Sequence, residues 1–213
     1  NITTTSVDFN WANNGTVTST NWEYIIQPCG TPAPTAGTAG IAATSHPITI
    51  SGLNANTCYD IYVRSICSAT DISPWTGPTT ITTLITPPAC GGTFTDPQGA
   101  TAQYINGLDN TVTICPSTPG EQVTVTFTSF DTEANWDGLY VFDGNSITST
   151  QIASANPASN VPGGLAGGFW GTTIPGPFTS SSPDGCLTFR FRSDGAVTRA
   201  GWIANVTCAL PAT

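Results

Sequence analysis

The stretch FDTEANWDGLYVFDG, residues 130–144, carries four carboxylates in a chain in which only 8% of the residues are charged. Two kinds of chemistry use such a group. Two carboxylates at a fixed separation can serve as acid and base or nucleophile in glycoside hydrolysis. Carboxylate oxygens from neighbouring loops can instead bind a hard cation such as calcium. Which of the two applies depends on where the flanking strands place Asp131, Glu133, Asp137 and Asp143.

Alternating side chains on both sides of this stretch predict two strands. VTVTFTSF alternates polar and apolar residues before it, and GLYVF is the strand that follows Asp137. Residues 131–137 are therefore expected to be the loop between these strands. Asp143 and Gly144 form a turn at the far end of the second strand. We expect Asp143 to be a turn residue, out of reach of the loop acids.

Few other residues could support catalysis. His46 is the single histidine, and its neighbours TSHPIT predict a surface or turn position at a strand start. The sequence contains no G-x-S-x-G, no H-E-x-x-H and no phosphate-binding glycine loop followed by a helix. The glycine-rich residues 161–171 are expected to be a loop, with Phe169 and Trp170 either packed in the core, which we favour, or forming an exposed contact patch. We therefore expect a protein that is not an enzyme.

The composition predicts an all-β protein from an oxidising, extracellular setting. The 213 residues include 22 Gly and 17 Pro set between short apolar runs, which favours many strands and turns and no helix. A net charge of −9 argues against nucleic acid as a partner. No apolar run is long enough to span a membrane. The 7 Cys lack zinc-site spacing, so they indicate disulfides in a secreted protein, with one thiol left over.

The chain is expected to contain two domains, residues 1–86 and 87–213. The seam is TTLITPPACGG, where an alternating strand runs into Pro87 and Pro88. Prolines end a strand and stiffen a linker. The sequence has no Met and opens inside a strand pattern, so we expect it to be a segment of a longer array.

Several features of residues 1–86 occur in a characteristic order. Trp11 lies in an early strand, Leu53 stands six residues before Tyr59, YDIYVRS follows, and SPWTGPTTITT forms the last strand. In this order they resemble a fibronectin type III domain whose usual first strand is missing. The resemblance implies a β-sandwich. The core residues that it implies are Trp11, Trp22, Tyr24, Ile26, Leu53, Tyr59, Ile61 and Val63.

The second domain carries its own ordered motifs. ACGGTFTDP, TICP, VTVTFTSFDTEANWDGLYVFDG, CLTFRFRSD and GWIANVTC follow one another through residues 90–208. This order is similar to that of a CUB domain, especially the variants in secreted multidomain proteins of Bacteroidota. The resemblance implies a jelly-roll β-sandwich that binds rather than catalyses.

The same resemblance implies a calcium site. In CUB domains that bind calcium, a Glu of the acidic loop, the Asp that opens the D-x-L-x-V segment and the Asp of a late S-D loop converge on one ion. The matching residues are Glu133, Asp137 and Asp194, with Asp131 and the carbonyl of Gly195 as weaker candidates. Without an ion, two carboxylates about 4 Å apart repel by roughly 4 kcal/mol at an effective dielectric near 20. The alternative is that the three acids are solvated separately in their loops.

Strand geometry predicts two of the disulfides. Antiparallel pairing of NWEYIIQPC with CYDIYVRSIC places Cys29 opposite Cys58. Cys67 then has inward parity and is expected to be a free, buried and inert thiol. If CLTFRFRS and GWIANVTC form a hairpin, Cys186 faces Cys208.

The third predicted bridge comes from the resemblance to CUB domains, in which Cys90 and Cys115 correspond to the first bridge of the family. Each of the bridges in the second domain would close a loop of two dozen or so residues and contribute on the order of 3 kcal/mol.

These observations favour a non-catalytic segment of a large secreted, cell-surface adhesin with a calcium-stabilised CUB-like module, linked to gliding or surface attachment. Export by type IX secretion follows from the resemblance alone. Expected partners are an extracellular protein or glycan and the secretion and surface-attachment machinery. Two alternatives remain open: accessory binding modules of a secreted hydrolase, and a structural repeat of an extracellular filament.

Overall fold

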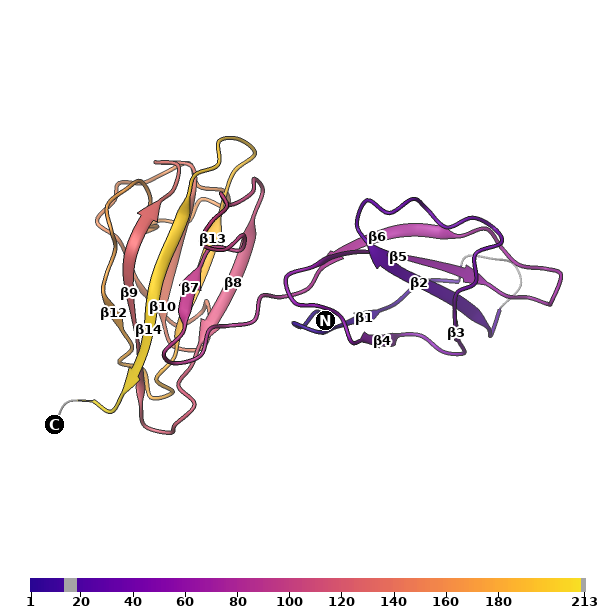
Figure 1. Cartoon of the computed structure of the whole chain (residues 1–213), viewed down its shortest axis with the longest axis horizontal. Helices are drawn as coiled ribbons and strands as arrows, with labels where there is room; N and C mark the ends of the chain where they lie inside the picture. Colours follow the sequence, from indigo (N-terminus) through magenta and orange to yellow (C-terminus); the bar gives the residue numbers. More distant parts are fainter. Residues whose placement is uncertain (14–18, 212–213) are drawn as a thin grey trace. The chain divides into compact units, whose positions relative to one another are not determined.

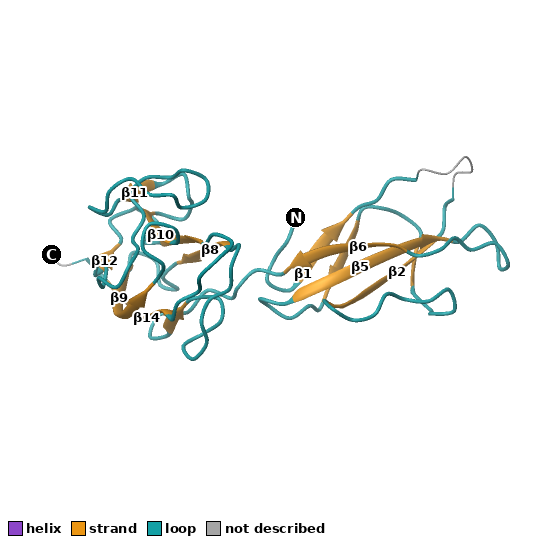
Figure 2. Cartoon of the chain, turned by 90° about the horizontal axis from the view of Figure 1, so that it is seen from above, coloured by secondary structure: helices purple, strands orange, loops and turns teal. Residues whose placement is uncertain are grey.

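A computed structural model describes residues 1–13 and 19–211. Residues 14–18, within the predicted domain 1–86, and residues 212–213, at the end of the predicted domain 87–213, lie outside this description. The described residues form strands joined by turns and loops, and no helix (Figure 2). None of them therefore belongs to a helix that could cross a membrane. The predicted all-β fold class is confirmed. The chain divides into two compact units, Asn1–Thr86 and Pro87–Thr213.

The first unit is a sandwich of two unequal sheets (Figure 1). A two-stranded sheet has the order β1-β4, and a four-stranded sheet has the order β3-β2-β5-β6. The strands are β1 (Ser6–Phe9), β2 (Trp22–Pro28), β3 (Ile41–Ala43), β4 (Ile48–Ser51), β5 (Cys58–Ser65) and β6 (Thr76–Thr82).

The core of the first unit lies between these two sheets. Inward residues of β1 and β4 meet those of β5, with Ile61 fully buried. Four of the predicted core residues are buried, namely Trp22, Leu53, Tyr59 and Ile61. The other four are partly buried and pack against the same cluster: Trp11, Tyr24, Ile26 and Val63.

The predicted register of β2 against β5 is also confirmed. Trp22 pairs with Ser65 and Pro28 with Tyr59, so that Cys29 and Cys58 face each other one position beyond and form a disulfide. Cys67 is free, as predicted, but it is exposed rather than buried. Its parity failed as a guide because Cys67 lies beyond the end of β5, where strand alternation no longer applies.

The second unit is a sandwich of two four-stranded sheets with the orders β11-β10-β13-β8 and β12-β9-β14-β7 (Figure 1). Aromatic side chains fill the space between them, and Phe94 of one sheet lies 4.8 Å from Phe189 of the other, centroid to centroid. The strands are β7 (Thr93–Thr95), β8 (Asp109–Ile114), β9 (Gln122–Asp131), β10 (Gly138–Asp143), β11 (Thr150–Ile152), β12 (Phe178–Thr179), β13 (Leu187–Arg192) and β14 (Gly201–Ala209).

The predicted hairpin of CLTFRFRS with GWIANVTC is wrong. These segments are β13 and β14, and they belong to opposite sheets: β13 pairs with β10 and β8, whereas β14 pairs with β9 and β7. The connection between them crosses the sandwich. Side-chain alternation reports which face of a strand is buried, but it does not report which strand lies beside it.

The disulfides of the second unit follow from this topology and overturn both predicted bridges. Cys115 bonds to Cys186, since β8 pairs with β13 and Ile114 lies opposite Leu187. Cys90 bonds to Cys208, because the segment before β7 runs beside the end of β14.

The glycine-rich loop carries its two aromatic residues at intermediate burial. Phe169 packs edge to face against Phe178 of β12, with ring centroids 5.1 Å apart. Trp170 lines a cavity of about 260 Å³ together with residues 154–156 and 173–176. The preference for a core position is therefore met only in part.

Candidate metal centre

Two loops bring the three predicted ligands to one end of the second sandwich. Glu133 and Asp137 lie in the connection from β9 to β10, and Asp194 is the second residue after β13. Because β10 and β13 are antiparallel, with Gly138 opposite Arg192, Asp137 and Asp194 leave the sheet at the same end. The pairing of two strands thus joins acids that stand 57 residues apart in the chain.

A tight turn sets the acidic loop. The N–H groups of Trp136 and Asp137 both donate to the carbonyl of Glu133, at 3.3 and 3.1 Å. Asn135 has a φ of 74°, in the left-handed region that Asn adopts more readily than most residues. This turn places the carboxyl groups of Glu133 and Asp137 on the same side of the loop.

Asp137 is the buried centre of the group, with none of its surface exposed. One carboxylate oxygen accepts the backbone N–H of Asp194 at 2.8 Å, and the other accepts the hydroxyl of Tyr104 at 2.5 Å. Burial raises the pKa of the Asp137 carboxyl, and these two hydrogen bonds oppose the rise. Each oxygen keeps a second lone pair that a cation could use.

Tyr104 ties a third segment to the site. It lies between β7 and β8, and its ring packs against Phe191 with a centroid distance of 4.9 Å. Its oxygen also accepts the backbone N–H of Glu133 at 3.0 Å. Burial and the hydrogen bond to Asp137 raise the pKa of Tyr104. The hydroxyl is therefore a fixed donor to Asp137.

The candidate ligand oxygens of Glu133, Asp137 and Asp194 all lie within 4.8 Å of one another. Glu133 and Asp194 are partly exposed, so the group opens to solvent on their side. Partial burial and the charges of Asp137 and Asp194 raise the pKa of the Glu133 carboxyl, against attraction by Arg199. The three carboxylates thus destabilise one another, because their negative charges repel.

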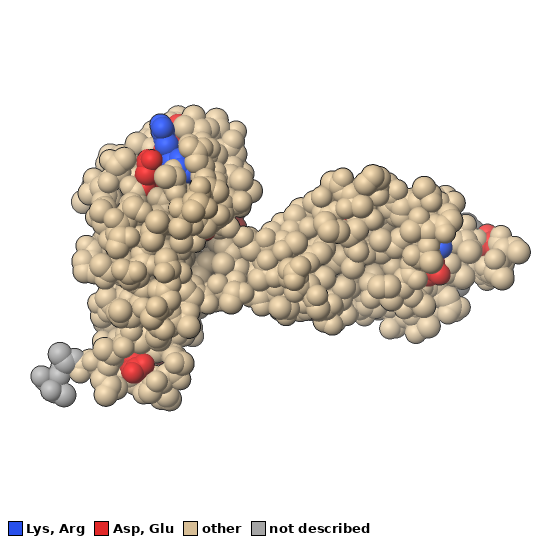
Figure 3. Space-filling model, in the orientation of Figure 1, with Lys and Arg blue, Asp and Glu red and all other residues tan. Residues whose placement is uncertain are grey.

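No side chain of the described residues forms an ion pair with these three acids. The salt bridges among the described residues join Arg64 to Glu23, and Arg190 and Arg192 to Asp109. Charged residues are sparse on the molecular face that Figure 3 shows. Calcium binds six to eight oxygens and prefers carboxylates, carbonyls and water, so this donor set fits calcium better than a soft metal.

The other acids of the stretch lie outside the group. Asp131 pairs with Gly201 in the β9–β14 ladder and is not among the clustered carboxylates. Gly195 is exposed, directly after Asp194. Neither weaker candidate is brought to the site by a contact seen in the described residues.

Asp143 lies at the opposite end of β10, as the sequence predicts, and has a structural role. Its carboxylate accepts the Ser180 hydroxyl and the Ser181 N–H, each at 2.9 Å, and the Ser182 N–H at 3.1 Å. Burial raises the pKa of Asp143, but these hydrogen bonds outweigh it and hold the pKa below its usual value. Asp143 fastens the segment that follows β12.

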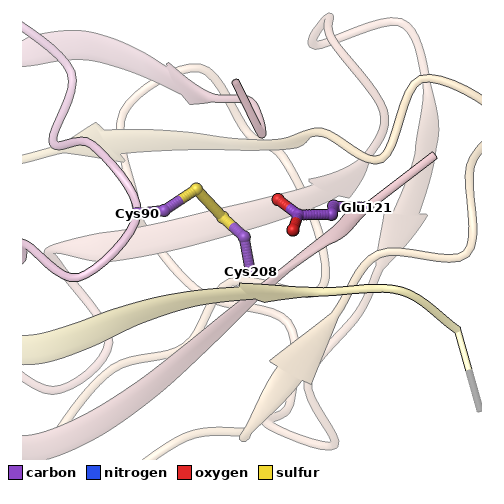
Figure 4. Close-up of side chains that lie close together, drawn as sticks. All are labelled: Cys90, Glu121 and Cys208. Carbon is purple, nitrogen blue, oxygen red and sulfur yellow. A yellow bond between two sulfur atoms is a disulfide. The ribbon is translucent and has the colours of Figure 1, made fainter. Parts of the chain in front are cut away.

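A second group with metal-binding residue types does not offer a site. Cys90, Glu121 and Cys208 lie close together, but the two sulfurs are bonded to each other (Figure 4). A disulfide has no thiolate to bind a metal. Glu121 alone remains, directly before β9.

Sequence reasoning found the three carboxylates but missed Tyr104. The two acidic loops carried a recognisable pattern, whereas Tyr104 stands in the polar segment TAQYINGL without periodicity. A lone tyrosine in such a segment was the only available signal.

The chain is similar to several solved structures. No protein-family model matches the chain. The calcium-bound CUB2 domain of MASP-1 is 20% identical, and the match covers 54% of this chain and 89% of that one with a TM-score of 0.35. The CUB1-EGF-CUB2 segment of human MASP-1/3 is 15% identical, with 97% and 94% covered and a TM-score of 0.40.

A third solved structure, the chitinase ChiA74 from Bacillus thuringiensis, is 18% identical, with 98% of this chain and 27% of that chain covered and a TM-score of 0.30. The sequence identities and the TM-scores are low for all three proteins.

Proposed function

We propose that the second unit is a CUB-like binding module stabilised by a calcium ion held by Glu133, Asp137 and Asp194. The observation that carries this proposal is the meeting of three carboxylates within 4.8 Å around a fully buried Asp137, with no ion pair to any of them among the described residues. Two unpaired carboxylates at such distances repel by several kcal/mol. A bound ion reverses the sign of this interaction and fastens the two loops to each other.

Thermal unfolding in calcium and in chelator tests the site. At a calcium concentration about 100 times the dissociation constant, binding stabilises the folded state by about 2.7 kcal/mol. In a unit of this size the melting temperature should rise by roughly 8 °C or more. Asp194→Asn should lose most of this rise and, in chelator, should melt no lower than the unmodified chain because one repulsive charge is gone.

Asp131→Asn is the matched control, since it removes an acid near the same loop but outside the group. It should keep the full calcium response. The calcium proposal fails if the melting temperature of the unmodified chain is the same in calcium and in chelator, or if Asp194→Asn responds as strongly as Asp131→Asn.

At the level of the whole chain, we propose a non-catalytic, secreted segment of a cell-surface adhesin, with a fibronectin type III-like unit before the CUB-like one. Three disulfides favour an oxidising, extracellular location. The burial of Asp137, with both oxygens already hydrogen-bonded, speaks against an acid–base pair that must reach a substrate. The proposed partners are an extracellular protein or glycan and the secretion and attachment machinery; type IX export and a link to gliding belong to the same proposal.

Binding measurements separate this adhesin proposal from its alternatives. The full chain, with and without calcium, would be applied to arrays of glycans and of extracellular matrix proteins. Calcium-dependent retention on a surface-bound protein or glycan supports the adhesin. Retention on one soluble polysaccharide, with a catalytic domain elsewhere in the same gene, would favour accessory modules of a hydrolase, and self-association alone would favour a filament repeat.

A further inference from the structure

The cavity of about 260 Å³ in the second unit is lined by three segments that are separate in the sequence. Phe169 and Trp170 of the glycine-rich loop form its aromatic wall, and residues 154–156 and 173–176 complete the lining. None of the three clustered carboxylates belongs to this lining. The cavity is therefore a feature distinct from the candidate metal centre.

Backbone hydrogen bonds hold the aromatic wall in place. The N–H and the carbonyl of Phe169 pair with those of Leu139, each at 2.9 Å. Directly after Trp170, the Gly171 carbonyl accepts the Thr132 N–H at 3.1 Å. A cavity whose walls are already fixed needs little ordering to accept a ligand, which lowers the entropic cost of binding.

The segment 154–156 is fixed against the same loop. The Ser154 hydroxyl and the Asn156 side-chain amide both donate to the Gly168 carbonyl, at 2.6 and 3.2 Å. The Ser154 oxygen also accepts the Asn156 N–H at 3.2 Å. These bonds leave the side-chain oxygen of Asn156 without a partner among the described residues. Asn156 thus offers an acceptor, held in one orientation, to a ligand.

Trp170 carries a further unused polar group. Its indole N–H is buried and has no hydrogen-bond acceptor among the described residues. A buried donor without an acceptor is energetically costly. This wall therefore lacks an acceptor that a ligand with oxygen atoms can supply.

The remaining lining narrows the class of ligand. No charged residue is found among the described residues that line the cavity, so a charged ligand would be left without an ion-pair partner. Thr173 and Ile174 are exposed at the rim, which opens the cavity to solvent. An aromatic wall with a few hydrogen-bonding groups suits a neutral molecule that combines C–H surfaces with hydroxyl groups. A purely apolar ligand would leave the polar groups of Asn156 and Trp170 unpaired.

We infer that this cavity binds one neutral, six-membered sugar ring of an extracellular polysaccharide. The C–H face of the ring packs on the aromatic wall, and its hydroxyls bond to the Asn156 side chain. A volume of about 260 Å³ holds a single ring, and the open rim lets the polysaccharide continue into solvent on both sides. The inference rests on the proposed binding role of the second unit, to which it adds a ligand class and a site outside the three acids.

Affinity electrophoresis of the full chain, with calcium present, tests this inference. The gels contain dextran, galactomannan or a mixed-linkage β-glucan as neutral probes, and polygalacturonate as a charged one. At least one neutral polysaccharide should retard the chain, and polygalacturonate should not. Trp170→Ala should weaken binding at least tenfold because it removes the aromatic wall. Ile174→Ser should weaken it at least threefold and, as a change at a half-exposed side chain, keeps the test decisive if Trp170→Ala does not fold.

Trp136→Ala is the matched control, since Trp136 is an exposed tryptophan of the same unit that lies outside the cavity. It should bind the polysaccharide as the unmodified chain does. The inference is overturned if no neutral probe retards the chain, if polygalacturonate alone does, or if Trp170→Ala and Ile174→Ser bind as tightly as Trp136→Ala. Binding of the hydrophobic dye Nile red at Trp170 without binding of any polysaccharide would assign an apolar ligand and overturn it as well.

The calcium response separates this test from that of the metal site. Trp170→Ala should keep the rise in melting temperature with calcium that the unmodified chain shows, because none of the three acids is changed. Loss of polysaccharide binding with an intact calcium response therefore concerns the cavity alone. Absence of a calcium response in the unmodified chain would concern the metal site alone.

Discussion

Tyr104 holds the buried carboxylate of Asp137 in place and also binds the backbone of the acidic loop. A buried carboxylate needs such donors, because desolvation without them costs several kcal/mol. If a calcium ion were bound, the same hydroxyl would hold the Asp137 carboxylate in the orientation in which it offers its oxygens as ligands. Tyr104 is thus a positioning residue whose effect is transmitted through Asp137.

Tyr104→Phe should destabilise the second unit by about 1–3 kcal/mol and weaken calcium binding by 10–100-fold, the range found for residues that orient metal ligands. Isothermal titration calorimetry measures the calcium affinity, and scanning calorimetry measures the stability. Tyr140→Phe is the control, since Tyr140 is also fully buried but donates to the Leu165 carbonyl. Equal calcium affinity in the two variants would contradict the role of Tyr104.

Asp96 provides a second measurable property at the residue scale. It is 2% exposed, and burial raises its pKa to about 6, although the N–H groups of Gln98 and Trp202 act in the opposite direction. Gly201, at a φ of 72°, packs against the carboxylate, and a Cβ at this position would collide with it. The folded unit therefore binds a proton at Asp96 more tightly than the unfolded chain does.

The sign of the pH dependence follows from this difference. The contribution of Asp96 is fully present below pH ~4 and is lost as the pH rises through about 6, by about 3 kcal/mol in total. Asp96→Asn keeps the shape of the side chain but has no proton to release. The denaturant midpoint of this variant in chelator should therefore change less between pH 4.5 and 7.5 than that of the unmodified chain. An unchanged pH dependence in the variant would show that Asp96 is not the titrating group.

At the scale of elements, the disulfides report which strands are neighbours. Each of the three bridges joins residues directly opposite in an antiparallel pair: β2 with β5, β8 with β13, and β14 with the segment before β7. The bridges therefore extend ladders that hydrogen bonds already define. They close long loops, which favours stabilisation through the unfolded chain.

Peptide mapping under non-reducing conditions should recover Cys115 linked to Cys186 and Cys90 linked to Cys208, with Cys67 open to alkylation. Replacing Cys115 and Cys186 together by Ala should destabilise the second unit by about 4 kcal/mol, since this bridge closes a loop of 71 residues. Cys67→Ala, which removes no bridge, should change stability little. Recovery of a Cys186–Cys208 peptide would contradict the two-sheet topology.

The success of sequence reasoning differed between these elements for a physical reason. The β2–β5 register was predictable because the alternation of both strands and the spacing of Cys29 and Cys58 agree on one pairing. The partner strands of β13 and β14 were not predictable, because a short loop can either reverse a strand within a sheet or cross to the other sheet. Alternation is the same in both cases, and the predicted bridge from Cys186 to Cys208 failed with it. The predicted bridge from Cys90 to Cys115 came from the resemblance to CUB domains and is also wrong.

In the candidate site, too, some residues could be predicted from the sequence and one could not. Glu133, Asp137 and Asp194 could be predicted because they match the positions of the calcium-binding acids in the CUB domains that the second domain resembles, and the structure brings them together. Tyr104 could not, because its contact with Asp137 depends on how a segment without periodicity returns across the end of the sandwich. Assignment of the two units to the fibronectin type III and CUB families remains a prediction, since whole-chain similarities are low.

At the scale of the whole molecule, the two units differ in how their ends are tied. In the first unit the single bridge, Cys29 to Cys58, is internal, and long segments extend from both sides of it. In the second unit Cys90 stands before the first strand and Cys208 is the last but one residue of the final strand. The second unit is thus closed covalently at the points where the chain enters and leaves it.

This closure determines how the molecule would respond to mechanical tension. A pull on the chain before Cys90 and after Cys208 passes from one end to the other through the sulfur–sulfur bond, so the strands between them carry little of it. In the first unit, tension applied at Asn1 and Thr86 falls on the hydrogen bonds of its strands. A tethered chain would therefore lengthen by unravelling the first unit, while the second unit, with its acidic loops, kept its shape.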